Sequence, residues 1–249
     1  MRTEYTLLSF DKYEIPVKIV REHRHSIRSA FGKDHLIIRF PVFIDKTAEE
    51  HYRQHLREWL LAQEASRPGL LTRYERRGDY TTGDTLIILG KSYQISLLEE
   101  ERKTCTARLA GDHISLHIDR ELSGYDRKLA IRSLLSKLLS RVYIPVFQER
   151  IHELAALHFE GQLRRPVKNV RFKYNHSNWG SCSNTGNINL STRLLLAPRE
   201  VIDYVIIHEL AHLIELNHSD RFWSWVAKAM PDYARHEKWL KEYGHQCDF

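Results

Sequence analysis

The segment that most constrains the fold lies near the end of the chain and reads as one almost wholly apolar helix. Residues 201–216 are apolar at most positions, and Pro198 just before them suits the first turn of a helix. A helix that is apolar on nearly every side is buried. His208, Glu209 and His212 are nevertheless set into it. Burying a carboxylate and two imidazoles costs free energy unless something compensates them, so we expect a bound partner at these side chains.

The spacing of the two histidines predicts that this partner is a metal ion. Positions i and i+4 of a helix lie one above the other on the same face, so His208 and His212 can bind one ion together. Glu209 lies about 100° around the helix from His208, so its carboxylate can reach a metal-bound water without being a ligand. The pattern therefore predicts a metal centre with Glu209 as its general base.

A catalytic zinc ion needs a third protein ligand and one open position. His218, six residues beyond His212, is the candidate. Asn217 can adopt the left-handed conformation that ends a helix and Ser219 can cap the next helix, so the chain can turn back toward the ion there. We expect His208, His212 and His218 to bind Zn²⁺, although Mn, Fe, Co or Ni suit the same ligands.

Other residues near the motif have open or structural interpretations. Glu215 follows His212 by three residues on the same side of the helix. It is either a fourth ligand, a hydrogen-bond partner of a ligand, or a carboxylate outside the site. The aromatic residues Phe222, Trp223 and Trp225 favour packing against the metal helix over binding a ligand.

Three functions are compatible with such a site. The first is peptide-bond hydrolysis, in which zinc activates water and polarises a carbonyl while Glu209 takes the proton and passes it to the leaving amine. The second is a metal-dependent phosphohydrolase of the pyrophosphatase type, acting on a nucleotide at the same site. The third is a protease module that works on proteins held at nucleic acid.

A basic stretch bears on the last two functions. It contains five cationic residues with no acidic residue between them: Arg164, Arg165, Lys168, Arg171 and Lys173. Such a run is either a solvated face or a patch that binds a nucleotide or nucleic acid. The net charge of +6 is too mild to decide between these interpretations. Neither a phosphate-binding glycine loop nor a nucleic-acid-binding motif accompanies the run.

Periodicity along the chain predicts an α+β fold with two lobes. Strands are expected at 15–20, 26–30, 35–40, 85–89, 93–98, 107–109 and 114–118, with turns at 32–34 and 90–91 and a helix over 46–61. A long helix should run from 125 to 160, kinked or broken at Pro145 and stopped at Gly161. Two further strands, 169–174 and 186–192, precede a helical end. No internal repeat is evident.

We accordingly place a small β-rich α+β lobe at 1–122 and a helical metal-binding lobe with a short antiparallel sheet at 123–249. The start of the chain lacks a secretory signal, and no apolar run reaches the roughly 18 residues of a membrane span. The three cysteines are odd in number and far apart, which does not fit a disulfide framework. These features favour a cytoplasmic protein that does not bind membranes, and its oligomeric state stays open.

Several motifs together resemble the YgjP-like metallopeptidase family, zincin-type relatives of the SprT-like and WLM proteases. They are Asn-Trp-Gly-Ser-Cys at 178–182, Ala-Pro at 197–198, His-Glu-Leu-Ala-His at 208–212, Asn-His-Ser at 217–219 and Arg-Phe-Trp at 221–223. The likeness is strongest over 179–239 and extends more weakly to residue 36. It implies a zincin-like catalytic lobe in which His208, His212 and His218 bind zinc and Glu209 is the base.

The resemblance also has a departure and two structural implications. The family usually has arginine where this chain has Asn178, which leaves any substrate role of that position open. Residues 187–192 should form a strand beside the cleft, to which an extended peptide could add as a further strand. The 180–183 loop either packs Trp179 or lines the cleft. Cys182 has no assignable base, which favours a buried, inert thiol.

Overall fold

The computed structural model describes residues 2–11, 13–32, 35–71, 74, 80–175 and 178–249. The chain divides into two compact units, Met1–Asp79 and Tyr80–Phe249, and the buried apolar residues of each form a core of their own. The change from strands to helices that the sequence places near residue 122 therefore occurs inside the second unit. The expected α+β class is confirmed, because helices and small sheets occur in both units.

The first unit is a four-stranded sheet with one helix. Its strands have the order β1-β2-β4-β3 and are β1 (Arg2–Phe10), β2 (Tyr13–Glu22), β3 (Arg28–Phe31) and β4 (Leu36–Pro41). Buried and half-buried residues alternate along β2 and β4, and α1 (Lys46–Ser66) turns Leu56 and Leu60 into the core. The sequence did not predict β1. Part of the expected turn at 32–34, Lys33 and Asp34, lies outside the described residues.

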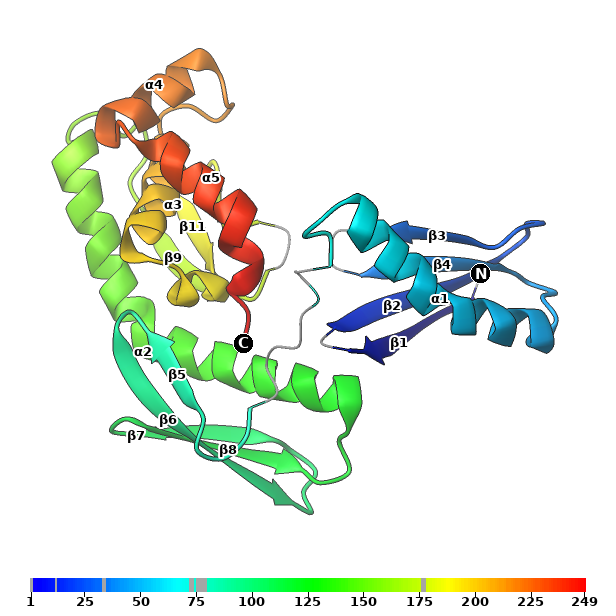
Figure 1. The fold of residues 1–249 in the computed structure, drawn as a ribbon. Helices are drawn as coiled ribbons and strands as arrows, with labels where there is room; N and C mark the ends of the chain where they lie inside the picture. Colours follow the sequence, from blue (N-terminus) through cyan, green and yellow to red (C-terminus); the bar gives the residue numbers. More distant parts are fainter. Residues whose placement is uncertain (1, 12, 33–34, 72–73, 75–79, 176–177) are drawn as a thin grey trace. The chain divides into compact units, whose positions relative to one another are not determined.

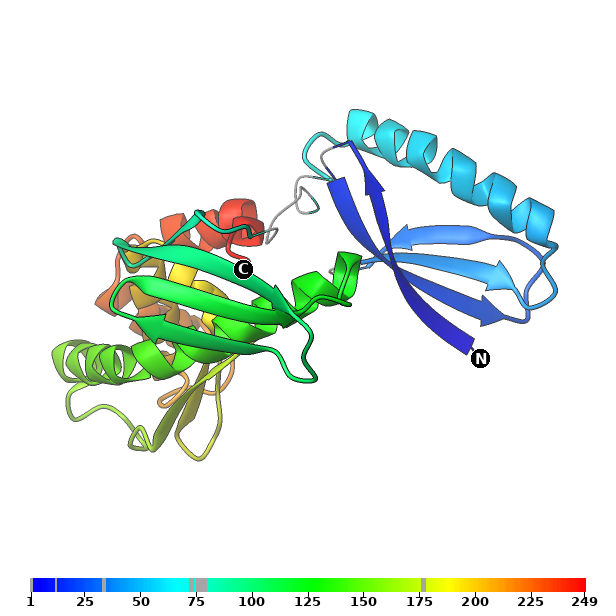
Figure 2. The same ribbon diagram turned by 90° about the horizontal axis from the view of Figure 1, so that it is seen from below.

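The second unit begins with a sheet of the same topology. Its strands, in the order β5-β6-β8-β7, are β5 (Thr85–Ile88), β6 (Lys91–Glu100), β7 (Thr106–Ala110) and β8 (His113–Asp119). Each sheet contains two antiparallel pairs joined by one parallel pair, and each is followed by a long helix (Figure 2). The two sheets therefore share one topology, although no internal repeat is evident in the sequence. Leu89 and Gly90, at φ 50° and 80°, make a tight turn one residue earlier than the expected 90–91, since Lys91 already belongs to β6.

The long helix α2 (Gly124–Phe159) spans 36 residues and contains Pro145, as the sequence predicts. Figure 1 shows a bend between its two halves, which a proline causes by removing one backbone hydrogen bond. Gly161 follows the helix with a φ of +67°, so it provides the left-handed stop. Ile131, Leu135, Leu139 and Ile151 of α2 are fully buried, so this helix lies in the core of the second unit.

A three-stranded sheet, three α-helices and two 3-10 helices complete the described part of the second unit. They are β9 (Asn169–Lys173), β10 (Gly180–Cys182), β11 (Asn187–Ser191), the 3-10 helix η2 (Thr192–Leu196), α3 (Arg199–Ala211), α4 (Asp220–Ala229), α5 (Tyr233–Tyr243) and the 3-10 helix η3 (Gly244–Gln246).

Two expectations about this sheet are corrected. The sheet has the order β10-β11-β9 and is mixed, because β11 pairs antiparallel with β10 but parallel with β9. The 180–183 segment, expected as a loop, contains the strand β10. Gly, Ser and Cys carry little strand propensity, so composition did not reveal it. Among the described residues, no helix has the length and apolarity needed to cross a membrane.

Candidate metal centre

Helix α3 places two of the three histidines. Its residues from Val201 to Ile207 are all buried, as the apolar pattern predicts, although the helix ends at Ala211 rather than near residue 216. His212 caps this end with helical dihedral angles, φ −66° and ψ −17°, and its N–H donates to the carbonyl of His208 at 3.3 Å. His208 and His212 therefore keep the helical i, i+4 relation, although the helix ends before the residue expected.

The third histidine is delivered by the loop between α3 and α4. Asn217 is not among the described residues with positive φ, so the expected left-handed helix stop is wrong. The chain instead leaves α3 through tight turns, with the Leu213 N–H donating to the Leu210 carbonyl at 2.9 Å. The predicted cap of the next helix is confirmed, since Ser219 Oγ accepts from the Phe222 N–H at 3.4 Å.

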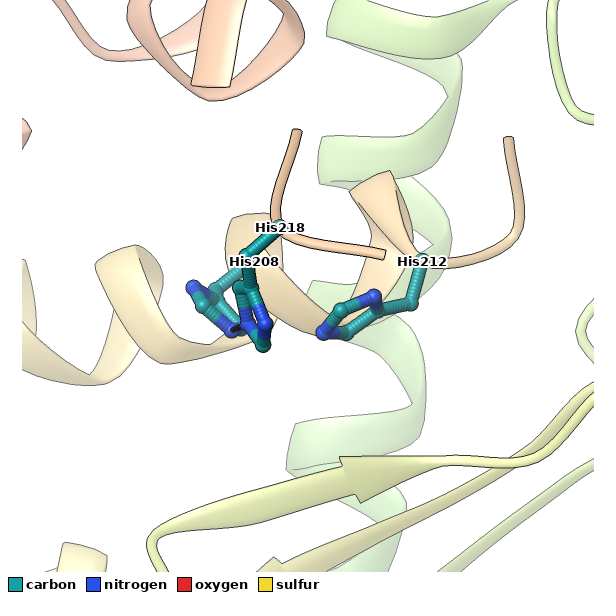
Figure 3. A group of neighbouring side chains, drawn as sticks. All are labelled: His208, His212 and His218. Atoms are coloured by element: carbon teal, nitrogen blue, oxygen red, sulfur yellow. Dashed lines mark hydrogen bonds between the residues drawn. The ribbon is translucent and has the colours of Figure 1, made fainter. Parts of the chain in front are cut away.

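The structure brings the three histidines together. The Nε2 atoms of His208 and His218 lie 3.0 Å apart, and one ring nitrogen from each of the three residues lies within 4.8 Å of the others. Figure 3 shows the three rings gathered at one point. Nitrogen ligands about 2.1 Å from one tetrahedral ion lie about 3.4 Å from each other. These residues therefore fit a single transition-metal ion.

The protonation of the imidazoles also suits metal binding. His212 Nδ1 lies 3.2 Å from the Glu215 carbonyl, and a donated hydrogen bond there leaves the Nε2 lone pair of His212 free. Burial first, and then the neighbouring histidines, lower the pKa of His208 to about 3. Burial likewise lowers the pKa of His212. Neutral imidazole is the form that coordinates a metal.

Glu215 thus acts in the site through its main-chain carbonyl. Its carboxylate is not part of the histidine cluster, so of the interpretations left open by the sequence, a carboxylate outside the site is the one that fits the side chain.

An aromatic layer supports the three rings. Phe222 is fully buried, and its ring centroid lies 4.9, 4.5 and 4.8 Å from those of His208, His212 and His218. Trp223 lies against two of them, 5.8 Å from His208 and 5.9 Å from His218. The expectation that the aromatic residues pack against the metal helix is confirmed for Phe222 and Trp223, whereas the ring of Trp225 lies 6.4 Å from that of Phe159 in α2.

Glu209 is buried beside the histidines with an unsatisfied oxygen. Its side chain is 4% exposed, and Oε2 has no hydrogen-bond partner among the described residues. Burial raises the pKa of Glu209 to about 8. A buried carboxylate oxygen without a partner is costly unless a ligand or solvent molecule satisfies it, so its position is consistent with a role in chemistry.

Gly180 leaves room for the Glu209 carboxylate. The sequence alone did not indicate this role of Gly180. A Cβ atom at residue 180 would lie 2.4 Å from Glu209 Oε1 and 2.8 Å from its Cγ and Cδ. Any larger residue would displace the carboxylate. The sequence does contain a glycine within the Trp-Gly-Ser-Cys motif. Because Gly180 is far from Glu209 along the chain, the sequence gives no indication that the two residues are in contact.

The histidines and Glu209 line a cavity of about 590 Å³. One wall is formed by residues 178–182, which include β10, and the other by Glu237, Leu240 and Lys241 of α5. Tyr204 and Val205 of α3 contribute as well. Sequence reasoning did not assign Tyr204 or the α5 residues, although Tyr204 stands one turn before His208 on the same helix face.

The 180–183 segment was expected either to pack Trp179 or to line the cleft, and Asn178, Trp179 and Cys182 show which of these it does. All three line the cavity, so the 178–183 segment has a place in the cleft as well as a structural one. Cys182 is half-buried rather than fully buried. Burial, with the nearby Glu209 carboxylate, raises the pKa of Cys182 to about 12. The thiol is therefore protonated at neutral pH and is a poor nucleophile, as expected.

Comparison with known families decides the assignment. The model of the YgjP-like metallopeptidase domain matches residues 24–243. The chain belongs to this family. The resemblance drawn from the sequence motifs is thereby confirmed, and the YgjP-like chain is assigned to the metal-dependent peptidases.

Comparisons with solved structures and with proteins of curated description add no argument to the family assignment. A solved structure described as the metallopeptidase zymogen of Pyrococcus abyssi abylysin is similar over 39% of this chain and 94% of its own chain, with 24% sequence identity and a TM-score of 0.34. No protein with a curated description matches the chain significantly.

Proposed function

We propose that this protein is a zinc peptidase in which His208, His212 and His218 hold the ion and Glu209 is the general base. One observation carries the proposal: three imidazole nitrogens within 4.8 Å of one another share a cavity with a buried, unsatisfied carboxylate. Three nitrogen ligands with a remaining open position are typical of catalytic zinc.

The ion and the protein contribute different parts of the chemistry. When bound, zinc supplies Lewis acidity, which makes water nucleophilic near neutral pH and polarises a carbonyl group. Glu209 accepts the proton of the attacking water at its free oxygen and then donates it to the leaving amine. The burial of Glu209 beside the histidines and its unpartnered Oε2 support this role as the proton carrier.

The free edge of β10 supports binding of an extended peptide. The strand expected to receive the peptide, β11, is paired on both sides by β10 and β9, so a peptide cannot add to it. The Ser191 N–H donates to the Trp179 carbonyl, and the Ser183 N–H donates to the Asn187 carbonyl. By the alternation of antiparallel pairs, the backbone groups of Gly180 and Cys182 point away from β11. We propose that substrate pairs with these groups.

The proposal is tested with a panel of unfolded proteins, peptides, nucleotides and DNA. We expect the zinc-loaded wild type to cleave polypeptides, and Glu209→Gln to lower kcat by about 10²- to 10⁴-fold while retaining zinc. His218→Ala should lose zinc affinity and activity together. The matched control is Glu215→Gln, which changes a nearby carboxylate outside the cluster and should keep most activity.

The same panel examines the two other functions. Turnover of nucleotides with peptides untouched, abolished by Glu209→Gln, would show that the site is a phosphohydrolase centre. Cleavage only of proteins bound to DNA would favour the nucleic-acid-associated protease. Absence of stoichiometric metal from the active protein would rule out the zinc centre itself.

A further inference from the structure

One wall of the cleft belongs to a long segment without any acidic residue. Between Glu160 and Glu200 the sequence contains no Asp or Glu, although it contains seven Lys and Arg residues. This segment includes all of the β10-β11-β9 sheet. No carboxylate within the sheet therefore offsets its positive charge.

Five of these cations form what we call the basic patch: Arg164, Arg165, Lys168, Arg171 and Lys173. Arg165 is half-buried and the other four are exposed. Arg171 and Lys173 alternate with Val170 and Phe172 along β9, so both point to the same exposed side of that edge strand.

The basic patch lacks internal counter-ions. None of its five residues forms an ion pair with any residue that the structure describes, whereas Arg102, Arg127, Arg132 and Arg150 of the same unit are all paired with carboxylates. Unpaired cations clustered on one surface produce a local positive potential that attracts anionic ligands.

The basic patch is continuous with the catalytic cleft. The Lys168 N–H donates to the Gly186 carbonyl at 2.8 Å, and a Cβ at Gly186 would lie 2.2 Å from the Pro166 carbonyl oxygen. The 164–168 segment therefore packs against the turn that joins β10 to β11. Cys182, at the end of β10 next to that turn, lines the cavity and lies within the electrostatic reach of Arg165.

The aromatic residues of the segment argue against nucleic acid as the ligand. Single-stranded nucleic acid binds where exposed aromatic rings stack on its bases. Here Phe172 packs edge-on against Phe147 with 4.8 Å between ring centroids, and Tyr174 donates to the Asp248 carboxylate. Trp179 is covered by the Arg193 guanidinium at 4.4 Å. Within the described residues, the segment offers charge without a stacking surface.

We propose that the basic patch binds an acid-rich segment of the polypeptide substrate, next to the bond that the cleft cleaves. This inference rests on the proposed peptidase function, because one extended chain would pair with β10 and continue past Cys182 toward Arg164, Arg165 and Lys168, whose segment packs against the β10–β11 turn. Arg171 and Lys173 lie on β9, at the opposite edge of the sheet from β10, so they add to the positive potential of the patch and do not contact the paired segment directly.

The test uses full-length protein and one cleavable peptide core that carries a tail of eight Glu or eight Gln at either end. Fluorescence anisotropy with the Glu209→Gln protein measures binding, and kcat/KM is measured with the active enzyme. One variant combines Arg164→Gln, Arg165→Gln, Lys168→Gln, Arg171→Gln and Lys173→Gln. A control variant combines Lys103→Gln, Arg108→Gln, Arg120→Gln, Lys137→Gln and Arg141→Gln, which removes equal charge from exposed positions elsewhere in the same unit.

We expect a Glu tail at one of the two ends to improve binding and kcat/KM about tenfold or more over the Gln tail at low salt, with the gain shrinking as salt rises. The patch variant should lose this gain and cleave the Gln-tailed peptide normally, whereas the control variant should keep the gain. Equal binding of both tails would overturn the inference. So would patch-dependent binding of a fluorescein-labelled dT20 oligonucleotide without binding of the Glu tail. If no peptide is cleaved but the Glu tail binds, only the peptidase function fails.

Discussion

At the scale of single residues, the position of Glu209 depends on the missing side chain of Gly180. Gly180→Ala would place a methyl group 2.4 Å from Glu209 Oε1, so the carboxylate must move. We predict that kcat falls by about 10²-fold, since small misplacements of a catalytic group cost this much, while zinc content is unchanged. Ser181→Ala, on the neighbouring strand residue, should stay within a few-fold of wild type. Normal kcat in Gly180→Ala would show that the contact does not matter.

Tyr204 contributes a phenol to the wall of the cavity. It lines the cavity one helical turn before His208, with 6.1 Å between the two ring centroids, and burial raises its pKa so that the phenol stays protonated. We expect Tyr204→Phe to lower kcat by about 10²-fold with KM and zinc content nearly unchanged, as for loss of an oxyanion donor. A variant with wild-type kcat would exclude this role.

Some site residues could be identified from the sequence and others could not. The difference is whether local helix geometry or tertiary packing brings the residue to the site. His208, Glu209 and His212 are related by helix geometry, which a sequence encodes directly. Gly180 and Leu240 reach the same cavity from β10 and α5 only through tertiary packing, and no local period encodes such a contact.

At the scale of elements, the cap of α4 fixes the loop that carries His218. Ser219 accepts from the Phe222 N–H, and His218 directly precedes it. We predict that Ser219→Ala lowers the free energy of unfolding by about 1 kcal/mol and weakens zinc binding several-fold, measured by denaturation and competition with a chelator. Ser219→Asp, which can cap the helix equally well, is the control. Unchanged zinc affinity in Ser219→Ala would mean that the cap does not position His218.

Local patterns predicted most elements but not their pairing. The strands at 85–89 and 114–118 and the long helix α2 follow from alternation and helical periodicity, and they are confirmed. Strand β10 was missed because three residues of low strand propensity give no pattern. The parallel pairing of β11 with β9 is set by tertiary contacts, so the sequence could not distinguish it from the antiparallel pairing expected.

At the scale of the whole molecule, the two units have separate cores, and the site lies entirely in the second. Every described residue of the histidine-lined cavity and of the larger core falls within Tyr80–Phe249. We predict that a fragment of residues 80–249 folds cooperatively and binds zinc with the affinity of the full chain, as measured by thermal unfolding and chelator competition.

A shorter fragment, residues 123–249, tests whether the domain boundary lies at 79/80, as in the structure, or at 122/123, as the sequence suggested. Residues 123–249 lack β5 to β8, whose Ile88, Tyr93, Ile95 and Leu116 are buried in the same core as α2 and α3. Removing them exposes apolar surface on α2, so this fragment should aggregate or unfold. A stable, zinc-binding 123–249 fragment would instead support the 122/123 boundary.

We propose that three imidazoles, those of His208, His212 and His218, hold a catalytic zinc ion. X-ray absorption spectroscopy at the zinc edge of the protein loaded with one equivalent of zinc tests it most directly. We expect multiple-scattering features of three imidazole ligands with Zn–N distances of about 2.0–2.1 Å. A sulfur shell near 2.3 Å, or a shell of oxygen atoms without imidazole scattering, would contradict it.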